Sequence, residues 1–152
     1  MSNIPYGRQD INQADIDAVV AVLHSDFLTQ GPAVQAFENS VANYCKAKHA
    51  VAVNSATSAL HIACLALGVG KGDIVWTTPI TFVASANCVL YCGATVDFVD
   101  IDQRTYNLSV DRLAEKLAVA EKAGKLPKVL IPVHLCGQPC DMAGIYVLSH
   151  KY

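Results

Sequence analysis

Short apolar segments alternate with helical patterns along most of this chain, and this alternation limits the fold more than any other feature. The strand candidates are residues 49–53, 74–77, 95–99 and 129–133. Helical periodicity fills the segments between and after them, at about 58–68, 80–92 and 109–123 and from Asp141 onward. Strands that alternate with helices build βαβ units. The sequence therefore predicts an α/β fold with a mainly parallel sheet and helices on both faces.

Two further helices are expected ahead of the alternating region. Apolar residues from Ile16 to Phe27 repeat at helical spacing, and Asn12 is placed to cap the first helix. The segment "LTQGP" ends this helix, and its Pro32 suits the first turn of the next one.

The size and composition indicate part of a larger molecule. The chain has 152 residues, of which 53% are hydrophobic and only 16% charged. This is enough chain to bury a core, but the balance is typical of a piece of a larger α/β protein. The last amphipathic helix, around Met142 and Leu148, is not followed by the strand that the βαβ pattern requires. We therefore expect residues 1–152 to form a single, truncated domain with an incomplete sheet.

Charge and hydropathy exclude some classes of function. The formal net charge is −2 and no basic stripe is present, so we expect no nucleic-acid partner. The N-terminus lacks a signal-peptide pattern, and no apolar run is long enough to span a bilayer. The sequence predicts a cytoplasmic protein without a membrane partner.

The cysteines do not predict a metal site. Cys88 and Cys92 form one C-x3-C pair, and Cys136 and Cys140 form another. Structural zinc sites usually have tighter spacing within turns. Cys88 and Cys92 are instead four residues apart in an apolar helix, which is typical of small core residues.

The stretch "VAVNSATSALHIAC", residues 51–64, predicts an anion site. It passes from a strand candidate directly into a helix, whose first N–H groups have no partners within the helix. These donors and the helix dipole favour a phosphate. Ala56 leaves room for it, and Thr57 and Ser58 add hydroxyl groups. Helix capping by the same Ser and Thr residues explains the composition equally well.

Other loops offer weaker candidates. "GVGKGD", residues 68–73, lacks the full phosphate-loop pattern and leads into a strand, so we interpret it as a turn. Phe82 follows a strand end and could stack on a heteroaromatic ring, although a core position is as common for Phe. His134 follows the last strand candidate, where a structural role is the more frequent one.

Five segments together resemble a known family. In order they are "IPYGRQDI", "LTQGP", "VAVNSATSALHIACLALGVGKGD", "TTPITFVASAN" and "IPVHLCGQPCDM". They resemble the pyridoxal-phosphate-dependent nucleotide-sugar aminotransferases of the DegT/DnrJ/EryC1/StrS type. The resemblance implies the N-terminal part of the large domain of a fold type I aminotransferase, which acts as a homodimer. It is greatest to the branch that aminates C4 of UDP-4-keto-6-deoxy-N-acetyl-β-L-altrosamine, with glutamate as donor, in pseudaminic acid biosynthesis.

The resemblance also implies roles for individual residues. Ala56 and Thr57 would hold the cofactor phosphate, and Phe82 would stack on the pyridine ring. The residues expected to contact the nucleotide-sugar are Tyr6, Asp26, Phe27, Leu28, Thr29 and Ala56.

The match to the family is incomplete at the catalytic groups. The resemblance implies that the family's reactive lysine, and the acid that keeps the pyridine nitrogen protonated, lie in segments beyond Tyr152. No catalytic residue is therefore assigned, and the chain alone is expected to be inactive. A sugar dehydratase of the same family differs at that lysine and remains an alternative. A non-catalytic remnant that binds phosphate or a nucleotide-sugar is the other.

Overall fold

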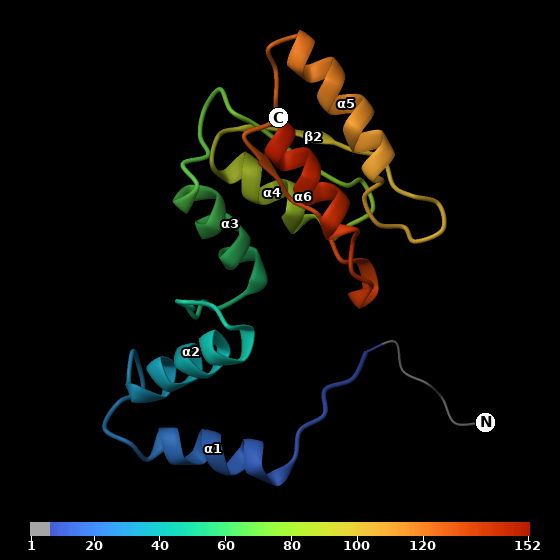
Figure 1. The fold of residues 1–152 in the computed structure, drawn as a ribbon. Helices are drawn as coiled ribbons and strands as arrows, with labels where there is room; N and C mark the ends of the chain where they lie inside the picture. The colour runs from blue at the N-terminus through green and yellow to red at the C-terminus, as the bar shows by residue number, and fades with distance from the viewer. Residues whose placement is uncertain (1–6) are drawn as a thin grey trace, which may run out of the picture. The chain divides into compact units, whose positions relative to one another are not determined.

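The computed structural model describes residues 7–152, and its contacts divide the chain into two compact units (Figure 1). The first unit extends to Ala52, and the second comprises Val53–Tyr152. Tyr6, expected at the substrate site, lies outside the described residues. The single domain expected over residues 1–152 stays a prediction.

The first unit consists of two helices, α1 (Gln13–Leu23) and α2 (Pro32–Cys45). Asn12 caps α1: its side-chain oxygen accepts a hydrogen bond from Ala14 N at 2.8 Å, and Asp15 accepts one from Asn12 N at 2.9 Å. This reciprocal arrangement satisfies donors that the first helical turn leaves free. Pro32 occupies the start of α2. Both helix starts are confirmed.

The second unit contains a parallel sheet of three strands in the order β2-β1-β3. The strands are β1 (Ile74–Thr77), β2 (Thr95–Phe98) and β3 (Val129–Leu130). The α-helices of this unit are α3 (Ala56–Ala66), α4 (Ala84–Tyr91), α5 (Val110–Lys122) and α6 (Met142–Lys151), with a short 3-10 helix, η1 (Leu135–Gly137). Within residues 7–152, no helix combines the length and the apolar character needed to cross a membrane.

The central strand β1 contributes to a core on each face of the sheet, because its side chains alternate. On one face Trp76 lies in a cluster with α5 and α6, including Leu113, Leu117 and Ile145. On the other face Val75 lies in a cluster with α3 and α4, including Cys64, Cys88 and Val89. Cys92 is half-buried against this second cluster. The predicted parallel α/β architecture is confirmed, and Cys88 and Cys92 pack in the core as expected.

The segment 49–53 differs from its prediction and forms no strand. No other described segment pairs with it, and Val51 is 72% exposed. The N–H of Ala52 donates instead to a carboxylate oxygen of Glu38 on α2, at 2.8 Å. A segment with an alternating apolar pattern forms a strand only where a neighbouring strand completes its ladder of hydrogen bonds. β3 is also shorter than expected, since Pro132 has no N–H to continue its ladder.

Candidate functional site at the carboxyl edge of the sheet

All three strands are parallel, so their carboxyl ends meet at one edge of the sheet. In open parallel sheets, ligands bind in the loops at this edge. Here the loops are residues 78–83 after β1, 99–109 after β2 and 131–141 after β3.

The start of α3 presents free backbone donors. Ser55 is the N-cap, and its hydroxyl oxygen accepts from the N–H of Ser58 at 3.2 Å. The hydroxyl of Ser58 donates to Asn54 Oδ1 at 2.6 Å. Within the described residues, the N–H groups of Ala56 and Thr57 have no hydrogen-bond acceptor. These two amides point from the positive end of a helix of 11 residues, the arrangement that anions favour.

The start of α3 also corrects one detail. Ser58 was expected to offer its hydroxyl to a phosphate, but Asn54 and Ser55 already occupy this group. Ser55 caps the helix, whereas Ala56 and Thr57 keep free amides.

Phe82 lies outside both cores. It sits in the turn between β1 and α4, and 74% of its surface is exposed. A hydroxyl contact of 2.8 Å between Thr81 and Ser85 closes this turn around it. The ring face of Phe82 is thus available to a planar ligand, although its cofactor role stays a prediction.

Two threonines at the end of β1 are fully buried. The hydroxyl of Thr77 donates to the carbonyl oxygen of Ile131 at 3.0 Å and joins β1 to the segment after β3. Thr78 Oγ1 has no hydrogen-bond partner in the described part of the chain. A buried hydroxyl without a partner is uncommon in proteins. It leaves one polar atom unsatisfied at the edge where ligands collect.

The loop after β3 is held by Asn107, which reaches it from the loop after β2. Asn107 is 3% exposed. Its amide nitrogen donates to the carbonyl oxygens of Gln138 and Pro139 at 2.9 and 3.1 Å, and its side-chain oxygen accepts from Leu135 N at 3.0 Å. One side chain thereby fixes the backbone at the first residue of η1 and directly after it.

His134 is positioned within this loop by Cys140. The N–H of Cys140 donates to His134 Nδ1 at 3.0 Å, and the Cys140 thiol donates to the carbonyl oxygen of Val133 at 3.1 Å. The imidazole is otherwise exposed.

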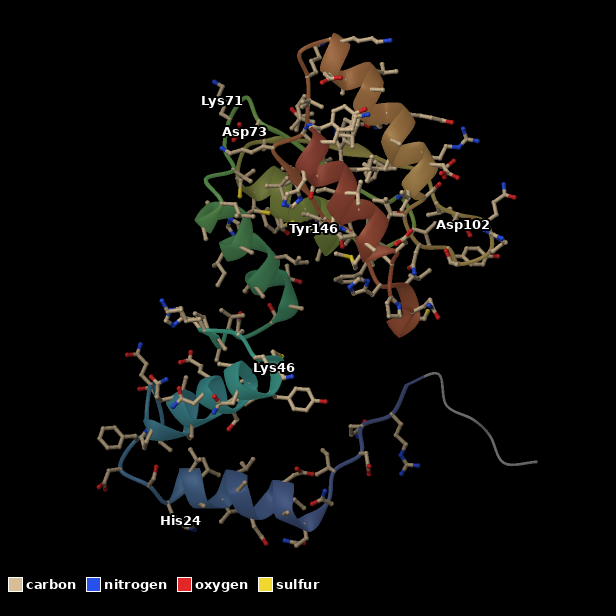
Figure 2. All side chains as sticks on the ribbon, viewed as in Figure 1. His24, Lys46, Lys71, Asp73, Asp102 and Tyr146 are labelled. Atoms are coloured by element: carbon tan, nitrogen blue, oxygen red, sulfur yellow. The ribbon has the colours of Figure 1, made fainter. Side chains whose placement is uncertain are left out.

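The loop after β2 is shaped by Asp102 (Figure 2). Its carboxylate accepts hydrogen bonds from the N–H groups of Arg104 and Thr105, at 2.9 and 3.0 Å. These two backbone hydrogen bonds lower the pKa of Asp102. Asp102 therefore acts as a turn residue, and its own N–H donates to the carbonyl oxygen of Asn107 at 2.8 Å.

The expected sugar-binding turn, residues 26–29, belongs to the first unit, between α1 and α2. Ser25 shapes it: its hydroxyl lies 2.8 Å from Val22 O and 3.3 Å from Phe27 N. Phe27 and Leu28 are exposed. Ala56, Thr57 and Phe82 belong to the second unit. The roles assigned to Asp26, Phe27, Leu28 and Thr29 stay predictions.

Three residues of the carboxyl edge were not found from the sequence: Thr78, Asn107 and Cys140. The partners of Asn107 lie 28 to 32 residues away, so no local pattern marks it. Cys140 was noted only for its spacing from Cys136. Thr78 lies within "TTPITFVASAN", where the sequence analysis assigned a role to Phe82 and none to Thr78.

A parallel α/β unit with loops gathered at the carboxyl edge of its sheet, and with free amides at the start of α3, has the features of α/β proteins that bind phosphorylated ligands. A family model makes the assignment specific. The chain belongs to the DegT/DnrJ/EryC1/StrS aminotransferase family, whose model matches residues 9–152. The family expected from the five segments is confirmed.

Characterised relatives match nearly the whole chain. It is 42% identical over 149 residues to the spore coat polysaccharide biosynthesis protein SpsC of Bacillus subtilis, covering 98% of this chain. It is 43% identical over 146 residues to GDP-perosamine synthase of Caulobacter vibrioides, covering 95% of this chain. The chain spans 37% of the length of each of these relatives.

Solved structures agree with the fold and with the cofactor of the family. Helicobacter pylori PseC, an aminotransferase involved in the biosynthesis of pseudoaminic acid, superposes with a TM-score of 0.88 at 29% identity, covering 99% of this chain and 39% of PseC. The putative sugar aminotransferase Spr1654 of Streptococcus pneumoniae, solved in PLP and PMP forms, gives 0.87 at 33–34% identity, covering 99% of this chain and 36–37% of its own. Pyridoxal phosphate as the cofactor of such relatives is thereby confirmed.

Proposed function

We propose that this chain is the cofactor-binding portion of a pyridoxal-phosphate-dependent sugar aminotransferase. The enzyme would transfer an amino group from glutamate to a nucleotide-linked 4-keto-6-deoxy sugar. The observation that carries the proposal is the pair of free amides at Ala56 and Thr57, in a chain that belongs to an aminotransferase family. The complete enzyme would be a cytoplasmic homodimer. Residues 1–152 alone would not catalyse the transfer, because they contain no lysine in the family's catalytic context.

The residues present fit pyridoxal phosphate. The amides of Ala56 and Thr57 would bind its phosphate with the α3 dipole, and the Thr57 hydroxyl would add a third donor. Phe82 would cover one face of its ring and exclude water from that side. The unsatisfied Thr78 hydroxyl is a further polar atom at the carboxyl end of β1. When bound, the cofactor supplies the electron sink for amino-group transfer, while the chain contributes binding and orientation.

For the sugar substrate, we propose the 4-keto-6-deoxy sugar of pseudaminic acid biosynthesis. The TM-score of 0.88 with Helicobacter pylori PseC supports this choice. The 43% identity to GDP-perosamine synthase supports the wider class of nucleotide-sugar substrates. The contacts would come from Tyr6, Asp26, Phe27, Leu28, Thr29 and Ala56.

Replacing Ala56 with proline tests the phosphate site directly. Proline removes the amide donor at the first helical position, where its ring is tolerated, and the extended backbone of Ser55 (φ −162°, ψ 157°) suits a residue before proline. We expect A56P to bind pyridoxamine 5′-phosphate ~10-fold more weakly, with an unchanged melting temperature, because one charge-assisted hydrogen bond is lost. Fluorescence titration of the purified chain measures the dissociation constant.

Two controls make this titration specific. A56G keeps the N–H at the same position and adds no bulk, so it should bind more tightly than A56P. Pyridoxamine without its phosphate should bind wild type and A56P equally. If the wild-type chain shows no preference for the phosphorylated ligand, the proposed cofactor site is wrong.

Phe82 is tested by truncating its ring. F82A should weaken binding of pyridoxamine 5′-phosphate by about 1 kcal/mol, or roughly fivefold, since stacking of aromatic rings contributes about this much. F82Y keeps the ring and should bind like wild type. Because the side chain is exposed, the melting temperature should stay the same. A large fall in the melting temperature with unchanged affinity would show instead that Phe82 serves packing.

A further inference from the structure

His134 is held in one tautomer by the backbone. Its Nδ1 accepts the Cys140 N–H at 3.0 Å, so Nδ1 of the neutral ring carries no proton. The proton of the neutral imidazole is therefore on Nε2. The ring thus has a hydrogen-bond donor on the side opposite Cys140.

The surrounding loop is rigid enough to keep this donor in place. Asn107 clamps the backbone at Leu135, Gln138 and Pro139. Within η1, Cys136 and Gly137 adopt left-handed conformations, with φ of 53° and 82°. A non-glycine residue in this region is uncommon and persists only where the surroundings impose it. The loop therefore presents a fixed imidazole rather than a mobile surface histidine.

The loop places this donor at the carboxyl edge of the sheet. The segment leading to His134 continues the contact between β3 and β1. The N–H of Ile131 donates to the carbonyl oxygen of Trp76 at 2.8 Å, and the carbonyl oxygen of Ile131 accepts from the Thr77 hydroxyl. His134 follows three residues later, at the carboxyl edge of the sheet. This is the edge that also holds the unsatisfied Thr78 hydroxyl.

We infer that His134 is a ligand-binding residue whose Nε2–H donates a hydrogen bond to an oxygen acceptor of the ligand bound at the carboxyl edge. The acceptor is the phenolic oxygen attached to the ring of a pyridoxal-type cofactor, or the carboxylate of the amino-acid donor. This inference rests on the proposed function. It also distinguishes two tasks of one side chain, since Nδ1 maintains the loop and Nε2 binds the ligand.

Two amide substitutions separate these tasks. In H134N the side-chain oxygen takes the place of Nδ1 and can accept the Cys140 N–H, but no donor remains at the position of Nε2. In H134Q the amide reaches the position of Nε2, but the acceptor for Cys140 is lost. We expect H134N to melt like wild type and to bind its ligand about tenfold more weakly. We expect H134Q to melt at a lower temperature and to keep more of the affinity than H134N.

The titration has two arms, with H150N as a control at an exposed histidine on α6. The first arm measures pyridoxamine 5′-phosphate binding to the purified chain. The second measures binding of 2-oxoglutarate, the keto acid with the same carboxylates as glutamate, to the chain saturated with that cofactor. Weaker binding by H134N in the first arm identifies the cofactor oxygen, and weaker binding in the second alone identifies the carboxylate. Equal affinities of H134N and wild type in both arms would overturn the inference.

Independent readouts separate this inference from the proposed function. Side-chain ¹⁵N NMR of the free protein should show protonated Nε2 and unprotonated Nδ1 for His134, and the opposite tautomer would overturn the inference. A wild-type chain that binds no pyridoxamine 5′-phosphate would overturn the proposed function and the His134 role with it. Tight wild-type binding that H134N leaves unchanged in both arms would overturn the His134 role alone.

Discussion

Replacing Asn107 with alanine is expected to lower the free energy of unfolding of the second unit by ~2–4 kcal/mol. The side chain is 3% exposed and makes three hydrogen bonds to the loop after β3. Its removal leaves the N–H of Leu135 and the carbonyl groups of Gln138 and Pro139 without partners. These three hydrogen bonds are partly buried, and groups that lose their partners in such surroundings are costly, so the expected effect exceeds that of an ordinary surface substitution.

Urea unfolding of the purified chain, followed by circular dichroism, measures this loss. N107D is an informative companion, because it keeps an acceptor for Leu135 but loses the donor to both carbonyl groups. It should therefore also be destabilised. Q103A, at an exposed position of the same loop, should unfold like wild type. If N107A unfolds with the midpoint of Q103A, the loop does not depend on this side chain.

Asn107 also illustrates what the sequence could and could not predict about the site. The start of α3 follows from local chemistry, since Ser55 caps a helix whose next two amides stay free. Loop 131–141 depends instead on contacts between segments far apart in the chain, which leave no periodic pattern. Its histidine was visible in the sequence, but the N–H of Cys140 that selects its tautomer was not. Helix capping by nearby residues can therefore be predicted from the sequence, whereas hydrogen bonds from a distant loop cannot.

The same division applies to the fold. β1 is found at the predicted residues 74–77, because it is a short apolar run between turns, buried on both faces. Residues 49–53 show a similar pattern but form no strand in the described structure, since no neighbouring strand pairs with them. The hydrophobic pattern of a segment indicates which of its faces is buried, whereas strand formation also requires a neighbouring strand.

The second core contains a cluster of thiols that makes the stability of this unit depend on alkaline pH. Cys64 on α3 packs with Cys88 on α4 and with Cys92, the residue that follows α4. The pKa of the Cys64 thiol is raised from its usual 9.0 to about 11, first by burial and then by the neighbouring Cys88 thiol, whereas Cys92 acts in the opposite direction. The folded protein thus keeps a proton that the unfolded chain loses about two pH units earlier.

The sign of the effect follows from this difference. Below about pH 9 the thiol is protonated in both states, and its stabilising contribution is complete. Between about pH 9 and 11 only the unfolded chain releases the proton, so the free energy of unfolding falls as the pH rises. A raised pKa of about two units corresponds to a total loss of ~2–3 kcal/mol by pH 11.

Comparison of wild type with C64A isolates this contribution from the lysines and tyrosines that titrate in the same range. The difference in unfolding free energy between the two proteins should be constant from about pH 7 to 8.5. It should then shift in favour of C64A by ~2 kcal/mol at about pH 10.5, measured by urea unfolding with a reductant present. C45A, at an exposed cysteine of the first unit, should instead follow the wild-type profile. Parallel profiles of wild type and C64A up to pH 10.5 would show that the Cys64 thiol ionises in the folded state as easily as in the unfolded chain, and that burial between α3 and α4 does not retain its proton.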